Sequence, residues 1–249
     1  MPVMDEFKEE REAMKHGTPK QKLTYFWDYY KWYVIGGIIG IALIVSLIHQ
    51  MVTRRETAFY ALMLNATEYN FMEDTSGNTA AFAEYAGIDE NKYQILYDTS
   101  VQIGTEAGDD YESSQKLMVY IAAGELDVMV SDSDSLTKYA YQGNFKDLRD
   151  FLTEEQLEKY RDSFYYIDNA VVKELDAANE AYNFDYVPDY GDPRHPEEMA
   201  EPIPTGIFLN EDCPLLKDYY FRGEDVAVSV LINTERPELT SGFIDFLMQ

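Results

Sequence analysis

The residues that could bind a ligand are short polar side chains that come directly after two apolar, strand-like runs. Asn65 follows the run 57–64, and the run 126–130 is followed by Ser131, Asp132, Ser133 and Asp134. Because ligands bind beyond the carboxyl ends of strands in an open parallel sheet, we expect these residues to line a binding site. Hydroxyl and N–H groups at a helix start can bind a polar ligand or an anion, and the adjacent aspartates favour a cation or a polyol. The alternative is that these residues only cap a helix.

No motif for catalysis or metal binding stands out. The tripeptide 132–134 has the D-x-D spacing of metal–nucleotide sites, but it lacks further ligands and the glycine and distal glutamate of an EF-hand loop. His195 lies among three loop acids, where a zinc site would need three or four convergent ligands, so we favour a solvated acidic loop. The sequence contains no G-x-S-x-G, no H-E-x-x-H and no phosphate-binding glycine loop. We therefore expect no enzyme activity, no metal site and no cofactor.

Composition argues against several classes of protein. The 249 residues include 46 acidic and 20 basic side chains, a net charge of −26, which argues against nucleic-acid binding because phosphate contacts need basic residues. The single cysteine, Cys213, excludes an intramolecular disulfide and a multi-cysteine metal cluster. Since 46% of the residues are hydrophobic, most of the chain can bury a core.

A membrane-spanning segment divides the chain. Residues 32–48 contain no charged side chain, and residues 33–52 reach the roughly 20 residues that cross a bilayer core of about 30 Å. The alternatives are a buried core helix and a cleaved signal peptide, but the run has no polar stripe and no Ala-x-Ala-like site follows it. We therefore expect an uncleaved, single-pass anchor at 33–52, between a segment 1–32 and a domain 53–249.

Basic residues near the ends of this anchor indicate its orientation. Four lysines precede it within about 20 residues, and Arg54 and Arg55 follow it. Residues 1–32 hold six basic and six acidic residues, whereas residues 53–249 hold 14 basic and 40 acidic residues. We predict a cell-membrane protein with a cytoplasmic N-terminus and an extracellular C-terminal domain.

The cytoplasmic segment carries helical signals. A charged helix is expected over 4–15, and Thr18 followed by Pro19 matches an N-cap and a proline at the first helical position. Seven aromatic residues between 25 and 33 are typical of a membrane interface, with a partner-binding face as the alternative. Gly36 and Gly40 have the G-x-x-x-G spacing at which two helices pack closely, which adds a homodimer to the candidate partners.

The extracellular domain alternates strand-like runs with helical patterns. Strands are expected at 57–64, 93–97, 126–130, 203–209 and 226–232. Helices are expected at 79–86, at 111–123, at 153–160 and at 238–248. One further helix is expected to start from a cap at 131–135 and to run through residue 141. Strands separated by single helices predict an α/β fold with a mainly parallel sheet and helices on both faces. The proline-rich residues 183–204 are expected to form a long surface loop or hairpin.

Two stretches of the domain carry a recognisable order of motifs. Residues 123–130, Ala-Gly-Glu-Leu-Asp-Val-Met-Val, place Gly-x-x-Asp between a helix and a strand, and residues 142–148, Gln-Gly-Asn-Phe-Lys-Asp-Leu, follow. This order resembles extracellular solute-binding proteins. Residues 228–234, which precede a helix with Phe-Ile-Asp-Phe-Leu, are also similar to the C-terminal pattern of those families. The entry to the membrane run, Tyr-Phe-Trp-x-Tyr-Tyr-Lys-Trp, resembles single-pass membrane proteins of clostridia-type bacteria. The resemblance implies a binding domain of the type 2 periplasmic class. This chain departs from that pattern, because its domain is short for the usual two lobes and its anchor is a helix instead of a lipidated cysteine.

Two functions remain in different classes. The first is a non-catalytic binding domain for a small solute or cation, and the second is an interaction or scaffold subunit of a cell-envelope membrane complex. An enzyme is the least favoured third. A deep pocket lined by Asn65 and residues 131–134 would favour the first function. A shallow surface with a broad apolar patch would favour the second.

The orientation of the anchor gives a direct prediction. A cysteine introduced within residues 1–20 should not react with a membrane-impermeant reagent added to intact cells, because that segment lies in the cytoplasm. Reaction from outside would contradict the proposed topology.

Overall fold

The computed structural model describes residues 18–69, 76–104, 110–183, 185–223 and 225–249. The helix expected over 4–15 lies outside these residues. The chain divides into two units, residues 1–54 and residues 55–249, which are described separately below.

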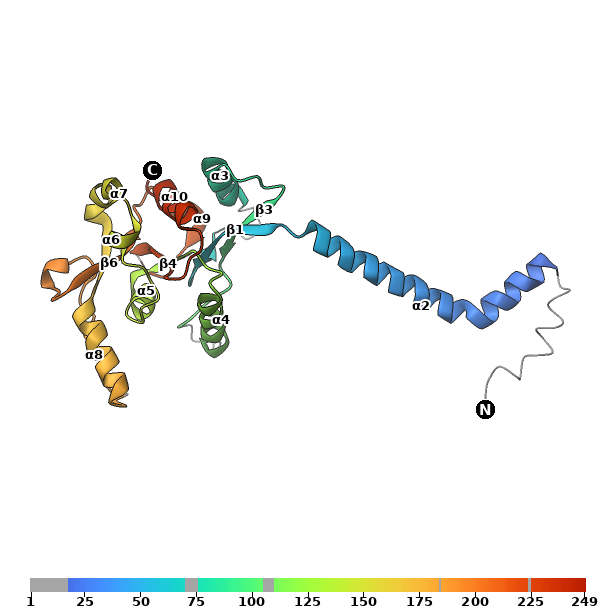
Figure 1. Ribbon diagram of the computed structural model, residues 1–249, viewed down its shortest axis with the longest axis horizontal. Helices are drawn as coiled ribbons and strands as arrows, with labels where there is room; N and C mark the ends of the chain where they lie inside the picture. Colours follow the sequence, from blue (N-terminus) through green and yellow to red (C-terminus); the bar gives the residue numbers. More distant parts are fainter. Residues whose placement is uncertain (1–17, 70–75, 105–109, 184, 224) are drawn as a thin grey trace. The chain divides into compact units, whose positions relative to one another are not determined.

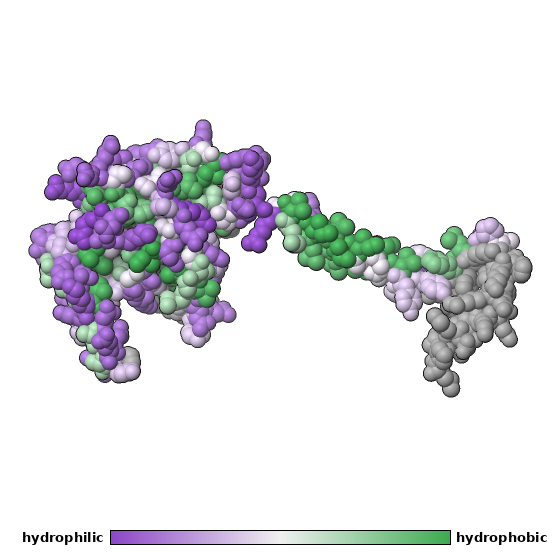
Figure 2. Space-filling model, in the orientation of Figure 1, coloured by the Kyte–Doolittle hydropathy of each residue, from purple (hydrophilic) through white to green (hydrophobic). Residues whose placement is uncertain are grey.

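The first unit is dominated by one long helix, α2 (Pro19–Thr53), which begins at the predicted proline. Its stretch Tyr30–Thr53 is long and apolar enough to cross a membrane, with a mean hydropathy of 2.1 and none of that window buried. The continuous green surface of this stretch is visible in Figure 2. At the start of the stretch, the rings of Phe26 and Tyr30 stack with their centroids 5.4 Å apart.

Six strands of the second unit form one mixed sheet (Figure 1). In the described residues they are, in spatial order, β3 (Tyr93–Asp98), β1 (Glu56–Met63), β4 (Val128–Asp132), β8 (Val226–Val230), β6 (Pro202–Phe208) and β5 (Phe164–Asp168). Strand β1 pairs in parallel with β3 and β4, whereas the β4–β8, β8–β6 and β6–β5 pairs are antiparallel. A small second sheet pairs β2 (Thr67–Glu68) with β7 (Tyr219–Tyr220).

Helices cover both faces of the large sheet, and each face has its own apolar core. The first face carries α3 (Ser76–Ala86), α6 (Leu148–Phe151), α7 (Glu154–Lys159), α9 (Leu215–Asp218) and α10 (Pro237–Leu247). The second face carries α4 (Asp110–Ala123), α5 (Ser133–Ala140) and α8 (Asn169–Glu180). Two short 3₁₀ turns, η1 (Arg161–Ser163) and η2 (Pro196–Glu198), complete the described elements.

The central strand explains why the sequence contains continuous apolar runs. Along β1, Phe59 and Met63 pack into the first core, whereas Tyr60 and Leu62 pack into the second. Successive side chains of a strand point to opposite faces, so a strand covered on both sides is apolar at every position.

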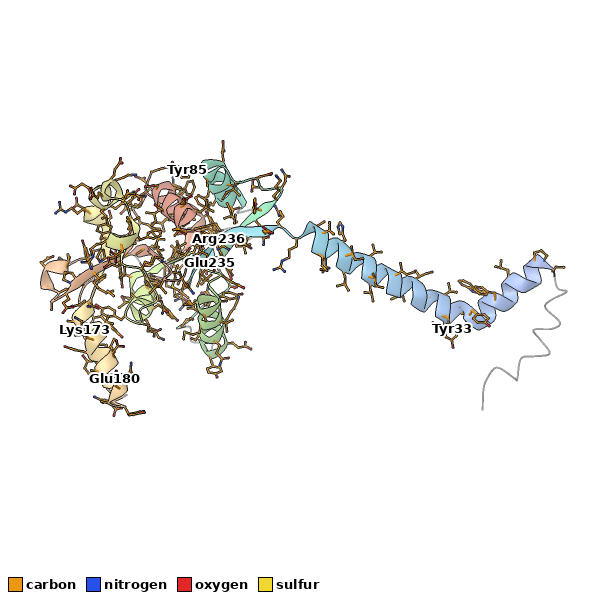
Figure 3. All side chains as sticks on the ribbon, viewed as in Figure 1. Tyr33, Tyr85, Lys173, Glu180, Glu235 and Arg236 are labelled. Atoms are coloured by element: carbon orange, nitrogen blue, oxygen red, sulfur yellow. The ribbon has the colours of Figure 1, made fainter. Side chains whose placement is uncertain are left out.

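The predicted α/β class is confirmed, and every predicted strand lies in the sheet. The parallel arrangement is limited to β3, β1 and β4, so the sheet is mixed instead of mainly parallel. The reason is that β8 inserts between β4 and β6 and runs opposite to both. The sequence did not predict β5 or α8, and α8 extends away from the sheet, as Lys173 and Glu180 show in Figure 3.

One buried carboxylate joins three segments of the second unit. The side chain of Asp127, which is fully buried, accepts hydrogen bonds from Tyr60 N (2.9 Å) and Thr234 Oγ1 (2.6 Å) and pairs with Arg236 Nη1 (3.0 Å). Its backbone N–H donates to Tyr60 O (2.9 Å), and its carbonyl accepts from Leu231 N (3.0 Å). Burial raises the pKa of this carboxyl, while the three donors act in the opposite direction. The entry to β4 is therefore fastened to β1 and to the segment between β8 and α10, where Figure 3 shows Arg236.

A second carboxylate fastens α8. Asp168, at the end of β5, accepts hydrogen bonds from the backbone N–H groups of Ala170 (2.9 Å), Ala200 (2.7 Å) and Glu201 (2.9 Å). Desolvation by burial raises its pKa, but these three hydrogen bonds to the charged form outweigh it and lower the pKa below the ordinary 3.8.

Asp168 should therefore contribute to the acid sensitivity of the domain. Because the folded pKa lies below the unfolded value, its stabilisation is present above pH 3.8 and is lost as the pH falls through the folded pKa. In fragment 55–249, Asp168→Asn should lower the free energy of unfolding by about 1–3 kcal/mol at pH 7 and flatten its decline below about pH 5. Urea unfolding followed by circular dichroism measures both quantities.

The matched control is Asp212→Asn, at an exposed position. It should leave both the stability at pH 7 and the pH profile unchanged. Equal pH profiles for Asp168→Asn and the unmodified fragment would contradict the assigned role.

Candidate functional site

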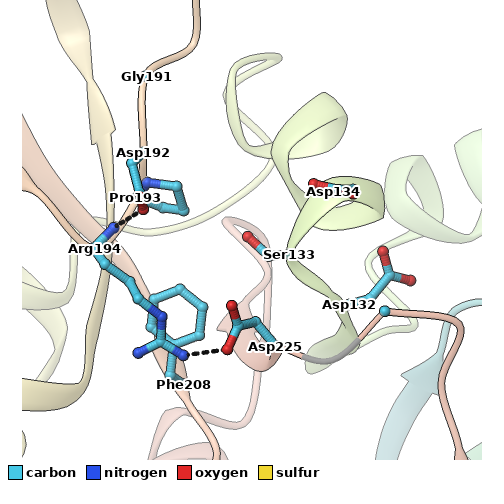
Figure 4. Close-up of a pocket in the computed structure, with 10 residues that line it drawn as sticks. Asp132, Ser133, Asp134, Gly191, Asp192, Pro193, Arg194, Phe208 and Asp225 are labelled. Carbon is cyan, nitrogen blue, oxygen red and sulfur yellow. Dashed lines mark hydrogen bonds and ion pairs between the residues drawn. The ribbon is translucent and has the colours of Figure 1, made fainter.

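A pocket of about 560 Å³ opens where β4 and β6 end and β8 begins. Four groups of residues line it: the start of α5, the segment 191–194, the end of β6 and the turn before β8 (Figure 4). The lining residues are Asp132, Ser133, Asp134, Gly191, Asp192, Pro193, Arg194, Phe208, Gly223 and Asp225. Two other hollows of similar size lie beside α7 and α10 and beside α3, and no sequence-predicted site residue lines either of them.

Three of the five predicted residues line this pocket, at the start of α5. Asp132 is the N-cap of that helix, because its Oδ1 accepts a hydrogen bond from Ser135 N at 3.0 Å. The predicted capping role is therefore present, in addition to the pocket position. Asp134 is exposed in the first turn, and Ser133 is half-buried with its N–H donating to Asp225 O at 2.7 Å.

Asn65 and Ser131 are not part of the pocket lining; both are buried inside the domain. The Asn65 amide donates to Ser135 Oγ (2.8 Å) and accepts from Ile103 N (2.7 Å). The Ser131 hydroxyl donates to Leu64 O (3.1 Å). These side chains join β1, β4 and α5 beneath the pocket, so their role in the structure is to position the residues that reach it.

The opposite side of the pocket is built on one arginine. The Arg194 guanidinium carbon lies 3.7 Å from the centroid of the Phe208 ring, and its Nη2 lies 2.6 Å from Asp225 Oδ1. The backbone N–H of Arg194 donates to Asp192 Oδ1 at 2.8 Å, which shapes the tight segment before it. Phe208 is buried in the second core, so the guanidinium lies over an aromatic ring that the core holds in place.

A glycine allows two walls of the pocket to meet. A Cβ added to Gly223 would lie 2.8 Å from the Cβ of Asp132, which is closer than real Cβ contacts. The turn before β8 can therefore approach the start of α5 only with a glycine at this position.

The charge of the pocket determines what it can bind. The pocket lining holds four carboxylates, those of Asp132, Asp134, Asp192 and Asp225, and one guanidinium, that of Arg194, which gives a formal charge of −3. Only Asp225 forms an ion pair with Arg194, and the excess of carboxylates repels anions and attracts cations. The pocket therefore favours a small polar ligand that carries positive charge.

The sequence analysis missed Arg194, Phe208 and Asp225. Phe208 lay inside a predicted strand, but nothing in the sequence showed that its strand ends beside α5. Asp225 comes before β8, and a parallel β8 would have put it at the opposite edge of the sheet. The antiparallel direction of β8 is what brings it to the pocket.

Three kinds of group bear on catalysis or metal binding: clustered acids, His195 and Cys213. Within the described ranges, no group of three or more His, Cys, Asp and Glu side chains is arranged to hold a metal ion. His195 Nδ1 lies 2.8 Å from Glu197 Oε1, and that contact raises the pKa of the half-exposed imidazole. Cys213 is buried, and burial raises the pKa of its thiol, which makes it a poor nucleophile.

Comparison of the chain with protein families, with curated proteins and with solved structures gives no match.

The stacking of Arg194 on Phe208 can be measured by a double-mutant cycle. In fragment 55–249, Arg194→Ala and Phe208→Leu should show a coupling free energy of about 0.5–1 kcal/mol in urea unfolding. The control is Lys92→Ala, directly before the edge strand β3, which three strands separate from β6. It should show no coupling with Phe208→Leu. Equal coupling in the two cycles would mean that the stacked geometry does not exist in solution.

Proposed function

We propose that this chain is a membrane-anchored, non-catalytic binding domain for small, positively charged solutes. The domain resembles a reduced solute-binding protein, lies on the extracellular side of the cell membrane and is held there by residues 33–52. The observation that carries this proposal is the acidic pocket at the ends of β4 and β6, which contains the predicted residues Asp132, Ser133 and Asp134.

The dimensions of the pocket support a small ligand. Its volume of about 560 Å³ falls within the roughly 300–1,000 Å³ of typical small-molecule sites. The pocket belongs to one compact unit, so binding would not require two lobes to close around the ligand.

The charge of the pocket and the field of the whole domain act in the same direction. Residues 53–249 carry 14 basic and 40 acidic side chains, so the domain attracts cations from a distance and the pocket retains them. A ligand ammonium group can compete with Arg194 for Asp225, whose side chain is 56% exposed. An aliphatic diamine is the simplest solute with this chemistry.

The anchor is supported by the exposed apolar surface of α2. None of the side chains in its apolar window is buried by other parts of the chain, as expected for a helix whose solvent is lipid. The four lysines before the span and two arginines after it favour a cytoplasmic N-terminus.

One observation favours the second candidate function, an interaction or scaffold subunit of a membrane complex. The outer face of α4 exposes Tyr111, Met118 and Val119, although the rest of the domain is strongly acidic. An exposed apolar helix face is a typical protein contact surface.

A thermal-shift screen tests the binding function. Fragment 55–249 should gain about 5–10 °C in melting temperature with a diamine at about 100 times its Kd, and nothing with neutral sugars or dicarboxylic acids. The shift should decrease in Asp134→Asn and Asp225→Asn, because each removes one carboxylate from the pocket. These variants are preferable to Asp132→Ala, which would also remove the cap of α5.

Asp212→Asn serves as the matched control, because it removes the same charge at an exposed position that does not line the pocket. It should keep the full shift. The binding function would be wrong if no cationic solute raises the melting temperature, or if the three variants respond alike.

A further inference from the structure

One side chain of the protein already fills a cation-binding position inside the acidic pocket. The Arg194 guanidinium carbon lies 3.7 Å from the centroid of the Phe208 ring, and Arg194 Nη2 lies 2.6 Å from Asp225 Oδ1 (Figure 4). An aromatic face beside a carboxylate is an arrangement that suits a planar, delocalised guanidinium. Phe208 and Asp225 therefore form a guanidinium subsite, and a group of the chain itself occupies it.

The guanidinium can leave this subsite without a change in the backbone. The segment that carries it is fastened through its main chain, since Pro193 O accepts a hydrogen bond from Tyr166 N (3.0 Å) and Arg194 N donates to Asp192 Oδ1 (2.8 Å). The Arg194 side chain is 44% exposed, and that of Asp225 is 56% exposed. Ion pairs with this much solvent contact contribute little free energy, so a ligand can displace the guanidinium.

The guanidinium subsite keeps its shape when the arginine leaves. The Phe208 ring is buried and packs against the Tyr165 ring, with the two centroids 5.4 Å apart. Asp225 is positioned through its carbonyl, which accepts a hydrogen bond from Ser133 N at 2.7 Å. These contacts do not involve Arg194, so the vacated subsite is ready for another cation.

We propose that Arg194 is a tethered competitor, which occupies the guanidinium subsite until a ligand with a guanidinium group at one end and an ammonium group at the other displaces it. The inference rests on the proposed binding function and narrows its ligand class. The ligand guanidinium replaces Arg194 on Phe208 and Asp225. The ligand ammonium pairs with Asp134, which lines the pocket from the start of α5.

A competitor within the pocket makes the pocket selective. An ammonium group is more strongly hydrated than a guanidinium and lacks its planar fork, so it displaces Arg194 less well. The apparent affinity of any ligand that uses the subsite is reduced by the fraction of molecules in which the subsite is free. The usual strengths of an exposed cation–π contact and a surface ion pair leave it free in about one molecule in ten.

Isothermal titration calorimetry of the full-length chain in phosphatidylcholine nanodiscs tests this competition. The probes are agmatine, an aminobutyl guanidine, and putrescine, the diamine with the same chain length and the same charge. The unmodified chain should bind agmatine at least about threefold more tightly than putrescine. Arg194→Ala should bind agmatine about tenfold more tightly than the unmodified chain does, because the subsite is then free. Circular dichroism of each variant checks that the domain is folded.

Three further variants separate competition from a simple change of charge. Lys138→Ala removes a positive charge from α5 outside the pocket lining, and it should change the affinity for agmatine by less than about twofold. Arg194→Lys keeps the charge and loses the planar group, so its affinity for agmatine should lie between those of the unmodified chain and Arg194→Ala. Phe208→Leu keeps every charge and should abolish the preference for agmatine over putrescine.

The outcomes distinguish this inference from the binding function on which it rests. If putrescine binds the unmodified chain but Arg194→Ala binds agmatine no more tightly than Lys138→Ala does, the competitor is overturned and the binding function stands. Equal affinities of Arg194→Ala for the two probes would also overturn the inference. If agmatine binds Arg194→Ala while neither probe binds the unmodified chain, the competitor is supported and the binding function is wrong. If neither probe binds either chain, both are overturned.

Discussion

The described part of the domain depends on the buried carboxylate of Asp127. It is the point at which β1, the entry to β4 and the segment after β8 are joined, through Tyr60, Thr234 and Arg236. These segments lie up to 176 residues apart in the chain, from Tyr60 to Arg236, so the joint holds the beginning and the end of the domain in one sheet. A buried carboxylate is tolerated only when hydrogen-bond donors surround it, and here each oxygen has at least one. The same joint fixes β8 antiparallel to β4, which brings Asp225 to the pocket.

The residues that carry the resemblance to solute-binding proteins serve this framework. Gly124 ends α4 with a φ of +67° and lies beside Asn233, and Asp127 forms the joint itself. In the second stretch, Phe145 forms a bridge with Leu231, and Asp147 caps α6. None of these four residues lines the acidic pocket. These motif residues therefore lie in the framework of the sheet and outside the acidic pocket.

Much of the architecture could be predicted from local patterns. Apolar runs identified β1, β3, β4, β6 and β8, and the capping box at Thr153 identified the start of α7, where both of its hydrogen bonds form. Strand direction was beyond such patterns, because it depends on contacts between residues far apart in the chain. Of the pocket lining, the sequence pointed to the residues at the end of β4 and not to Arg194 and Asp225, which the antiparallel strands bring in. Asn65 was placed correctly at a strand end, but its positive φ of 59° turns its amide into the domain.

The role of Asp127 is tested most directly by the stability of Asp127→Ala in fragment 55–249, combined with hydrogen exchange at Tyr60. Removal of the carboxylate leaves the buried Tyr60 N–H without its acceptor and takes an acceptor from Thr234 and Arg236. We expect a loss of about 2–4 kcal/mol in the free energy of unfolding and faster exchange of the Tyr60 amide, with Asp127→Asn intermediate because its amide oxygen still accepts. A free energy of unfolding within about 0.5 kcal/mol of the unmodified fragment, with Tyr60 exchange unchanged, would contradict it.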